Sequence, residues 1–170
     1  DNTLSVSFKS ISQPKDPEYA RRQLKVLNEL YKLVTEVTND CLWEWDLQTR
    51  EIFWIDGGHK RVFGYQIENA LIPQDFWESR LHPDDRVRVL AKLSKTIMEW
   101  PGCIWEDEYR FKRANGDYAY VCDRGHIIFD DERTAVRMIG ATQDVSSRKL
   151  TEIKLLQERV TRQNEITSAV

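Results

Sequence analysis

The sequence predicts an α+β fold built around an antiparallel sheet. Short stretches that alternate between apolar and polar residues, as half-buried strands do, occur in two groups along the chain. Segments with a helical period lie between the two groups, and short turn signals separate the strands within each group. Strands joined by such short turns pair antiparallel. The expected strands are 42–47, 51–55, 104–113, 117–129 and 134–144.

The composition is that of a globular chain, and it argues against several functional classes. The chain has 170 residues, of which 41% are hydrophobic and 31% charged, with a formal net charge of -3. This mild acidity argues against a nucleic-acid surface, which needs a basic face. No apolar run approaches the roughly 20 residues that cross a bilayer, so we expect no direct membrane contact. Three widely spaced cysteines, Cys41, Cys103 and Cys122, favour a reducing cytoplasm over a disulfide framework.

A helix is expected before the first strand. Residues 1–16 have no clear period and form a loose lead-in, whereas 17–38 form an N-terminal amphipathic helix. Two apolar stripes run along this helix, and one of them has heptad spacing. The helix can therefore contact its own domain on one side and a partner helix on the other. The heptad stripe, which we expect to carry dimer contacts, includes Leu24, Leu27, Tyr31 and Val34.

The strands have a predicted inward face and a predicted outward face. Trp43, Trp45 and Leu47 share one face of the first strand, and Gln48-Thr49-Arg50 forms the turn to the second. Asn115-Gly116 is a typical hairpin turn between the third and fourth strands. In the third strand the residues expected on one face are Trp105, Asp107, Tyr109 and Phe111.

Helices are expected between the two groups of strands. His59 to Phe63 forms a short helix that Gly64 ends, and a longer helix runs from Pro83 to about Glu99. A proline at the first helical position and acidic residues in the first turn both favour the start of this longer helix. Its expected apolar face is Val87, Leu90, Ala91, Ser94, Ile97 and Met98.

The last segment, 147–170, is a polar helix with a weak heptad seam. Lys149, Gln163 and Thr167 occupy seam positions where a stable coiled coil has apolar residues. We expect this segment to be a C-terminal signalling helix and the native chain to continue beyond it. The segment contains no histidine, so no phosphoacceptor site is expected in it.

Five motifs in order give the sequence a family resemblance. They are Leu42–Leu47, Phe63-Gly64-Tyr65, His82–Arg86, Asn115-Gly116-Asp117 and Ile139–Arg148. In this order and spacing the sequence resembles a PAS domain, of the subtype common in bacterial and archaeal signalling proteins such as sensor histidine kinases.

The resemblance implies a more specific fold than the pattern does. It implies a PAS domain at 40–146, with a five-stranded antiparallel sheet and with short helices and one longer helix on one face. The family usually has glycine where Arg50 stands, so the first turn is expected to hold a less relaxed geometry.

No constellation of catalytic residues is present in the sequence. The nucleophile, phosphate-binding, zinc-protease and dinucleotide motifs are all missing, and His59, His82 and His126 are far apart. We therefore expect no catalytic residues and no metal site.

The resemblance also suggests which cofactors to expect. Haem-binding PAS domains use an inward histidine on the long helix, and 83–99 has none; the cysteine run of flavin-binding light sensors is missing as well. We predict no cofactor and disfavour haem and flavin, while an unknown small molecule between sheet and helices remains open. Its walls would be Trp45, Phe53, Tyr109 and Phe111, and the alternative, which we favour, is that these side chains fill the core.

The run that ends the domain is the most informative for function. Asp144, Ser146 and Arg148 resemble the Asp-x-Thr exit motif of PAS domains, with serine in place of threonine. A short hydroxyl side chain at this position is expected to accept hydrogen bonds from free N–H groups of the following helix. We interpret these three residues as the signal junction.

Together these observations predict a non-catalytic, cytoplasmic PAS sensory and dimerisation module of a larger signal-transduction protein. Its expected partners are a second copy in a parallel homodimer and a C-terminal output domain of the same chain, for which a histidine kinase is the first candidate. The alternatives are an interaction scaffold with a filled core and no ligand, or a module of a cyclic-dinucleotide signalling enzyme.

Overall fold

The computed structural model describes residues 17–55, 57–67, 70–99 and 104–168. The chain forms two compact units, residues 1–34 and residues 35–170. The predicted lead-in, Cys103 and the last two residues of the predicted C-terminal helix lie outside the described residues. No described helix has both the length and the apolar character needed to cross a bilayer.

Helix α1, Pro17–Thr38, provides all of the described residues of the first unit. Its large apolar side chains are exposed within that unit, including Leu24, Leu27 and Tyr31. The last turn of α1 belongs to the second unit. There Thr35 is buried, and its carbonyl oxygen accepts a hydrogen bond of 3.1 Å from the Arg61 guanidinium.

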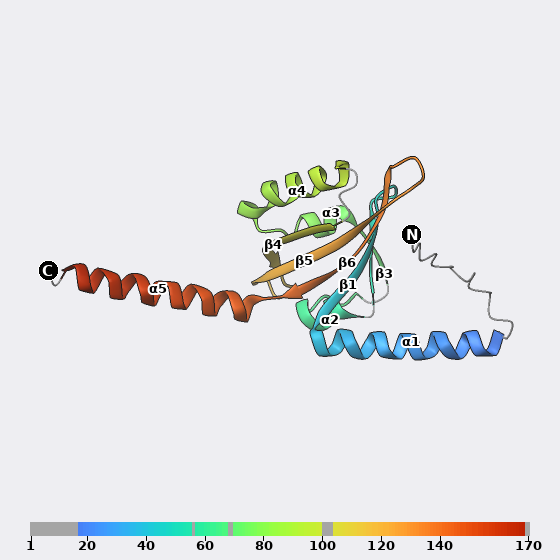
Figure 1. Cartoon of the computed structure of the whole chain (residues 1–170), viewed down its shortest axis with the longest axis horizontal. Helices are drawn as coiled ribbons and strands as arrows, with labels where there is room; N and C mark the ends of the chain where they lie inside the picture. The colour runs from blue at the N-terminus through green and yellow to red at the C-terminus, as the bar shows by residue number, and fades with distance from the viewer. Residues whose placement is uncertain (1–16, 56, 68–69, 100–103, 169–170) are drawn as a thin grey trace, which may run out of the picture. The chain divides into compact units, whose positions relative to one another are not determined.

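The second unit is organised around an antiparallel sheet of six strands in the order β3-β2-β1-β6-β5-β4 (Figure 1). The resemblance implied five strands, and the additional one is β3, which pairs with β2 at an edge. A strand of only four residues that ends in Pro73 shows no clear alternation in the sequence, and proline is tolerated at a sheet edge. The bounds are Asp40–Asp46 for β1, Glu51–Trp54 for β2, Ala70–Pro73 for β3, Ile104–Lys112 for β4, Tyr118–Phe129 for β5 and Ala135–Asp144 for β6.

The turns between strands carry left-handed backbone positions. Arg50 in the β1–β2 turn has φ of 61°, and Arg133 in the β5–β6 turn has φ of 65°. A non-glycine residue pays a steric cost in this conformation. The expected less relaxed geometry at Arg50 is therefore confirmed. Asp46 stabilises the same turn by accepting hydrogen bonds of 2.8 and 2.9 Å from the N–H groups of Gln48 and Thr49.

The described part of the second unit also contains four helices: α2 at Gly58–Phe63, α3 at Gln74–Glu78, α4 at Pro83–Met98 and α5 at Ser146–Ser168. Pro83 opens α4 as predicted, and the His82 ring accepts a hydrogen bond from the N–H of Asp84. Helix α4 lies beside β4 (Figure 1). The predicted apolar face of α4 was partly wrong. Its buried residues are Val89 and Leu93, whereas Val87 and Met98 are exposed.

The core lies on the inward face of the sheet. The predicted alternation of β4 is confirmed, because Trp105, Asp107, Tyr109 and Phe111 are all buried while Glu106 is exposed. Trp43 and Trp45 point inward from β1. The inward face therefore combines large aromatic rings with two buried carboxyl groups, those of Asp107 and Asp123.

Candidate functional site

A small cavity of about 30 Å³ lies within the core. This volume holds roughly two water-sized groups, and it is far below that of a site for a drug-sized ligand. Strands β1, β2, β4, β5 and β6 and helices α2, α3 and α4 all contribute to its walls. Its aromatic lining is Trp43, Trp45, Trp54, Trp77 and Trp105, and its polar lining is His59, Asp123 and Thr142.

Two glycines make room for the indole ring of Trp43. Gly140 is the register partner of both Trp43 on β1 and Gly125 on β5, so these three positions form one row across the sheet. A Cβ atom added at Gly140 would lie 2.3 Å from the Trp43 ring, and one at Gly125 would lie 2.6 Å from it. The absence of side chains in this row therefore lets the indole lie flat over the sheet and reach the polar groups beyond it.

Asp123 is the centre of a buried hydrogen-bond cluster. Its Oδ1 accepts from Trp43 Nε1 at 2.9 Å and from the Thr142 hydroxyl at 2.9 Å, and its Oδ2 accepts from the Tyr109 hydroxyl at 2.6 Å. Trp77 Nε1 donates in turn to the Tyr109 oxygen at 3.0 Å. Burial raises the pKa of Asp123 to about 6, although the three donors favour the carboxylate. The cluster therefore holds an acid that titrates near physiological pH.

Three other polar atoms of the cavity wall have no partner among the described residues. They are Trp45 Nε1, Trp105 Nε1 and His59 Nδ1. His59 stacks on Trp54 with ring centroids 3.9 Å apart, and burial lowers its pKa to about 3, so the imidazole is neutral. Buried polar groups in proteins are almost always hydrogen-bonded. All three residues line the same cavity, and its volume suits the one or two water molecules that usually pair with such groups.

Only one of the four predicted wall residues lines the cavity. Trp45 lines the cavity. Phe53 is a correction, because it is half-buried on the opposite face of β2 from the inward Trp54. Tyr109 and Phe111 are buried on the inward face but lie outside the lining. Tyr109 reaches the cluster through its hydroxyl, whereas Phe111 packs edge-to-face on Phe63.

Sequence reasoning missed Asp123 and His59 as site residues. Asp123 stands at an inward position of β5, between the buried Val121 and Gly125. An acid within an apolar strand face is a signal that periodicity alone could have shown. His59 had no comparable signal, because its burial depends on how a six-residue helix packs on Trp54.

The predicted signal junction joins β6, β5 and α5. Asp144 Oδ1 accepts from the N–H of Ser146 at 2.9 Å, and the Asp144 carboxylate forms an ion pair with Arg113. Partial burial opposes ionisation, but these donors hold the pKa of Asp144 below its usual value. The Ser146 hydroxyl accepts from the N–H of Tyr120 on β5 at 3.0 Å, and Val145 N–H donates to the Tyr120 carbonyl at 2.8 Å.

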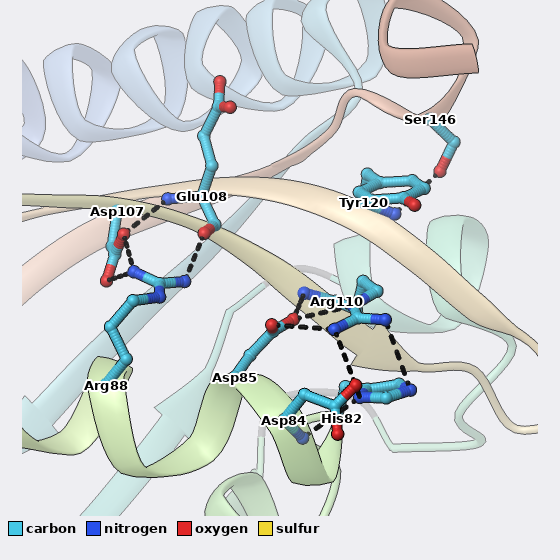
Figure 2. A network of polar contacts seen from close by, with 9 residues as sticks. All are labelled: His82, Asp84, Asp85, Arg88, Asp107, Glu108, Arg110, Tyr120 and Ser146. Carbon is cyan, nitrogen blue, oxygen red and sulfur yellow. Dashed lines mark hydrogen bonds and ion pairs between the residues drawn. The ribbon is translucent and has the colours of Figure 1, made fainter. Parts of the chain in front are cut away.

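The role expected of the Ser146 hydroxyl is therefore corrected. We expected it to accept from N–H groups of the helix that follows, but it accepts from a backbone N–H of the neighbouring strand β5 instead (Figure 2). The Asp144 carboxylate takes the role of accepting from the first helix N–H. The junction holds the start of α5 to β5 as well as to its own strand β6.

The first turn of α5 is also bound to β4. Arg148 and Lys149 each approach the Glu108 carboxylate to 2.5 Å, and the contact with Lys149 lowers the pKa of Glu108. The backbone of Glu108 is engaged as well, because its carbonyl accepts from Arg88 of α4 at 2.8 Å. Arg88 also binds both oxygens of the buried Asp107 (Figure 2). Residues 107–108 thus connect α4 with α5.

A second group of charges fixes the N-terminal end of α4 to β4. Asp85 accepts from the side chain and the backbone N–H of Arg110 at 2.9 Å, and this contact lowers the pKa of Asp85. The same guanidinium approaches Asp84 and the His82 ring at 3.4 Å (Figure 2). The bidentate geometry makes this a positional constraint as well as an ion pair.

The described residues show no cluster suited to a metal ion. In this part of the chain no three His, Cys, Asp or Glu side chains come together in a way that could hold one. Cys122 is a buried free thiol, and burial raises its pKa, which disfavours the thiolate form.

Comparison with known proteins identifies the fold and its relatives. The sequence profile of the PAS fold family matches residues 52–142. Hybrid signal transduction histidine kinase A of Dictyostelium discoideum is 30% identical over 83 residues, which cover 47% of this chain and 4% of that protein. The chain thus matches only a small part of that relative.

Solved structures show the same architecture. A sensory box histidine kinase/response regulator from Burkholderia thailandensis E264 superposes with a TM-score of 0.67 at 26% identity, covering 79% of this chain and 98% of that one. The N-terminal domain of a diguanylate cyclase with PAS/PAC sensor from Marinobacter aquaeolei gives a TM-score of 0.54 at 23% identity, covering 65% and 98%, and this likeness bears on the fold alone. Because the family profile spans more than half of the sequence, the chain belongs to the PAS fold family, and it is a PAS sensory domain related to those of signalling histidine kinases.

Proposed function

We propose that this chain is a non-catalytic sensory module that passes a change in its core cavity to α5, and through α5 to an output domain of the same protein. One observation carries the proposal. The three strands that supply Trp105, Asp123 and Thr142 to the cavity also hold the first turn of α5.

The path between cavity and helix is short on each strand. On β5, Asp123 lies three positions from Tyr120, which binds Ser146. On β6, Thr142 lies two positions from Asp144, which accepts from the N–H of Ser146. Strands in a packed sheet move as units, so a shift of the Asp123 cluster changes the backbone that anchors α5.

Strand β4 connects the cavity with α5 and also with α4. Trp105 lies in the cavity wall, and Glu108, three positions further along, binds Arg148 and Lys149 of α5. The Glu108 carbonyl is held by Arg88, so a movement of α4 also reaches the start of α5. Charged contacts of this kind are short and directional, which suits them to reporting small displacements.

The same module is proposed to act as a parallel homodimer through α1. The stripe of Leu24, Leu27, Tyr31 and Val34 is 44–60% exposed within its own unit. A helix of 22 residues by itself is marginal in water, and an exposed apolar stripe is stabilised when another surface covers it. The second apolar stripe of α1 needs such a surface as well. A second copy supplies an identical stripe, and the two α5 helices would then leave side by side.

The likeness to a hybrid histidine kinase and to a sensory box histidine kinase supports a histidine kinase as the parent protein. A kinase output and a cytoplasmic location are part of this proposal. The small volume of the cavity favours a second candidate, a scaffold PAS domain whose filled core binds no ligand. The two candidates differ in whether a change at the cavity reaches α5.

Amide hydrogen exchange tests the proposed transmission. Asp123→Asn keeps the size of the side chain but changes its charge and one of its hydrogen-bonding groups. We expect it to change the exchange rates of the amides in the first turn of α5, residues 147–151, several-fold. The matched control is Asp131→Asn, the same chemical change in the exposed β5–β6 turn, which should leave these rates unaltered.

A folded Asp123→Asn variant with wild-type exchange in residues 147–151 would contradict the transmission and support the scaffold. Near-ultraviolet circular dichroism of the tryptophans identifies a variant whose core is still packed.

A further inference from the structure

We propose that a basic pocket on the surface of the second unit binds a phosphate group. The pocket lies between the loop that joins α3 to α4 and the hairpin that joins β4 to β5, and its cationic residues are Arg80, Lys112 and Arg113. The binding itself is independent of the proposed sensory function. Only its consequence for α5 rests on that function.

The pocket has the volume of a small-molecule site. It is an open hollow of about 440 Å³, within the range of roughly 300–1,000 Å³ that is typical of ligand pockets. Lys112 and Asn115 in its wall are exposed. A phosphate group can therefore enter the pocket while the rest of a ligand stays at the surface.

The charge of the pocket is opposite to that of the chain. The chain has a formal net charge of -3, whereas three cations and no carboxylate line the pocket. Arg113 forms an ion pair with Asp144. Among the residues that the structure describes, neither Arg80 nor Lys112 forms an ion pair with a carboxylate. Cations gathered in one hollow attract anions from solution, so the pocket favours an anionic ligand.

Arg80 is held in place by groups that do not neutralise its charge. Its guanidinium carbon lies 3.5 Å from the centroid of the Phe76 ring. Its Nη1 donates to the Phe76 carbonyl at 3.1 Å and to the Ser79 hydroxyl at 2.6 Å. A guanidinium that is already ordered loses less conformational entropy when it binds an anion. Arg80 is therefore preorganised for a ligand.

The backbone places Lys112 beside Arg80. The Lys112 N–H donates to the Arg80 carbonyl at 2.8 Å, and the Lys112 carbonyl accepts from the Tyr65 hydroxyl at 2.5 Å. These two bonds fix the backbone of Lys112, while its side chain is exposed. Both cations belong to the lining of one pocket, so a single ligand can contact both.

A phosphate group suits these cations better than a carboxylate does. Near pH 7 it carries almost two negative charges and three acceptor oxygens, whereas a carboxylate carries one charge and two oxygens. A guanidinium can bind two of the phosphate oxygens, and an ammonium adds a point charge. Asp117, in the same hairpin, lies outside the lining, and its carboxylate accepts from the Asn115 amide at 3.0 Å.

Arg113 connects the pocket with the signal junction. It lines the pocket, and its guanidinium forms the ion pair with Asp144, whose Oδ1 accepts from the N–H of Ser146. A bound phosphate and the Asp144 carboxylate are alternative partners for this guanidinium. Because linkage is reciprocal, removal of the Asp144 charge should strengthen phosphate binding.

Three probes test the ligand class in phosphate-free buffer at pH 7.5. Phenyl phosphate and benzoate share an aromatic ring but differ in charge, and inorganic phosphate lacks the ring. Proton–nitrogen correlation spectra report the amide signals of residues 112–116. We expect millimolar phenyl phosphate to shift these signals in a saturable manner and benzoate to bind at least about fivefold more weakly. Equal binding of inorganic phosphate would assign the site to free phosphate, and weaker binding would assign it to a phosphate ester.

Two lysine variants test the pocket. Lys112→Gln and Lys95→Gln each remove one positive charge from an exposed side chain, and Lys95 lies on α4 outside the pocket. We expect Lys112→Gln to weaken phenyl phosphate binding about tenfold and Lys95→Gln to change it less than about twofold. Asp144→Asn keeps an acceptor for the Ser146 N–H but frees Arg113, and it should strengthen binding several-fold.

The outcomes separate this inference from the sensory function. No saturable shift, equal binding of phenyl phosphate and benzoate, or equal losses in the two lysine variants would overturn the phosphate site. An unchanged affinity in a folded Asp144→Asn variant would overturn the shared role of Arg113. Wild-type exchange at residues 147–151 in Asp123→Asn contradicts the transmission from the core, and it leaves the phosphate site standing.

Discussion

The side-chain hydroxyl of Ser146 accepts a hydrogen bond from the backbone N–H of Tyr120, 3.0 Å away, and so ties the first residue of α5 to β5. Ser146→Ala removes the only acceptor that the structure shows for this half-buried N–H. We expect the free energy of unfolding to fall by about 1 kcal/mol in urea titrations. Exchange of the Tyr120 amide should accelerate by more than that of the amides in α4.

Ser146→Thr is the control for this effect. Threonine keeps the hydroxyl, and it is the residue that PAS domains usually have at this position. We expect wild-type exchange at Tyr120 and stability within about 0.5 kcal/mol of wild type. Equal losses in the alanine and threonine variants would show that the hydroxyl contributes nothing.

Asp123 gives the stability of the domain a specific dependence on pH. Its pKa is about 6 in the folded chain and 3.8 ordinarily, so the folded state binds more protons than the unfolded state between these values. The Asp123 contribution to stability is therefore fully present below about pH 4 and is lost as pH rises through 6. His59 acts in the opposite direction, because its folded pKa of about 3 makes its contribution fall as pH decreases below 6.5.

The two contributions separate when a variant is compared with wild type. In the difference in free energy of unfolding between wild type and Asp123→Asn, the contributions of His59 and of the other carboxyl groups cancel. We expect the wild type to lose stability relative to the variant as pH rises from 4 to 6, and the difference to stay constant from 6.5 to 8. Urea titrations at half-unit intervals measure it, and a difference that is flat from pH 4 to 8 would contradict the raised pKa.

Much of the fold follows from sequence periodicity. The alternation in β4 and the helix start at Pro83 needed only local pattern, and both are confirmed. The edge strand β3 was missed, since four residues carry too little pattern. The buried face of α4 was predicted only in part. This helix has apolar residues on several sides, and its packing on β4 determines which of them are buried.

The candidate site was less predictable than the fold. Trp45 was identified as a wall residue from its strand face, but Phe53 was placed on the wrong side of β2. The Asp123 cluster joins residues from five elements that lie up to 99 positions apart in the chain, as Trp43 and Thr142 do. Such a cluster depends on strand register, which local pattern does not determine when non-consecutive strands such as β1 and β6 pair.

The two glycines beneath the Trp43 ring, Gly125 and Gly140, are predicted to differ in the stability cost of an alanine substitution. A Cβ at Gly140 would lie 2.2 Å from the carbonyl oxygen of Arg124, a backbone atom that cannot move alone. A Cβ at Gly125 would meet the terminal methyl of Met138 at 2.5 Å, which can rotate away, and the Trp43 ring at 2.6 Å. We expect Gly140→Ala to cost about 3 kcal/mol and Gly125→Ala about 1–2 kcal/mol in urea unfolding. Equal or reversed costs would contradict a limit set by the Arg124 carbonyl oxygen, because only Gly140 meets this backbone atom.

The proposed dimer places Leu27 at the centre of a helix–helix contact and Asn28, the next residue, at its exposed edge. Leu27 belongs to the heptad stripe of α1 and is 60% exposed within its own unit, whereas Asn28 lies off that stripe. Leu27→Asp and Asn28→Asp add the same charge at neighbouring positions of one helix, so they differ only in the face that they change. In sedimentation experiments at tens of micromolar we expect wild type and Asn28→Asp to be dimers and Leu27→Asp to be a monomer. A wild-type monomer, or equal dimerisation of both variants, would contradict a dimer through this stripe, because a buried aspartate without a partner costs several kcal/mol at a helix seam.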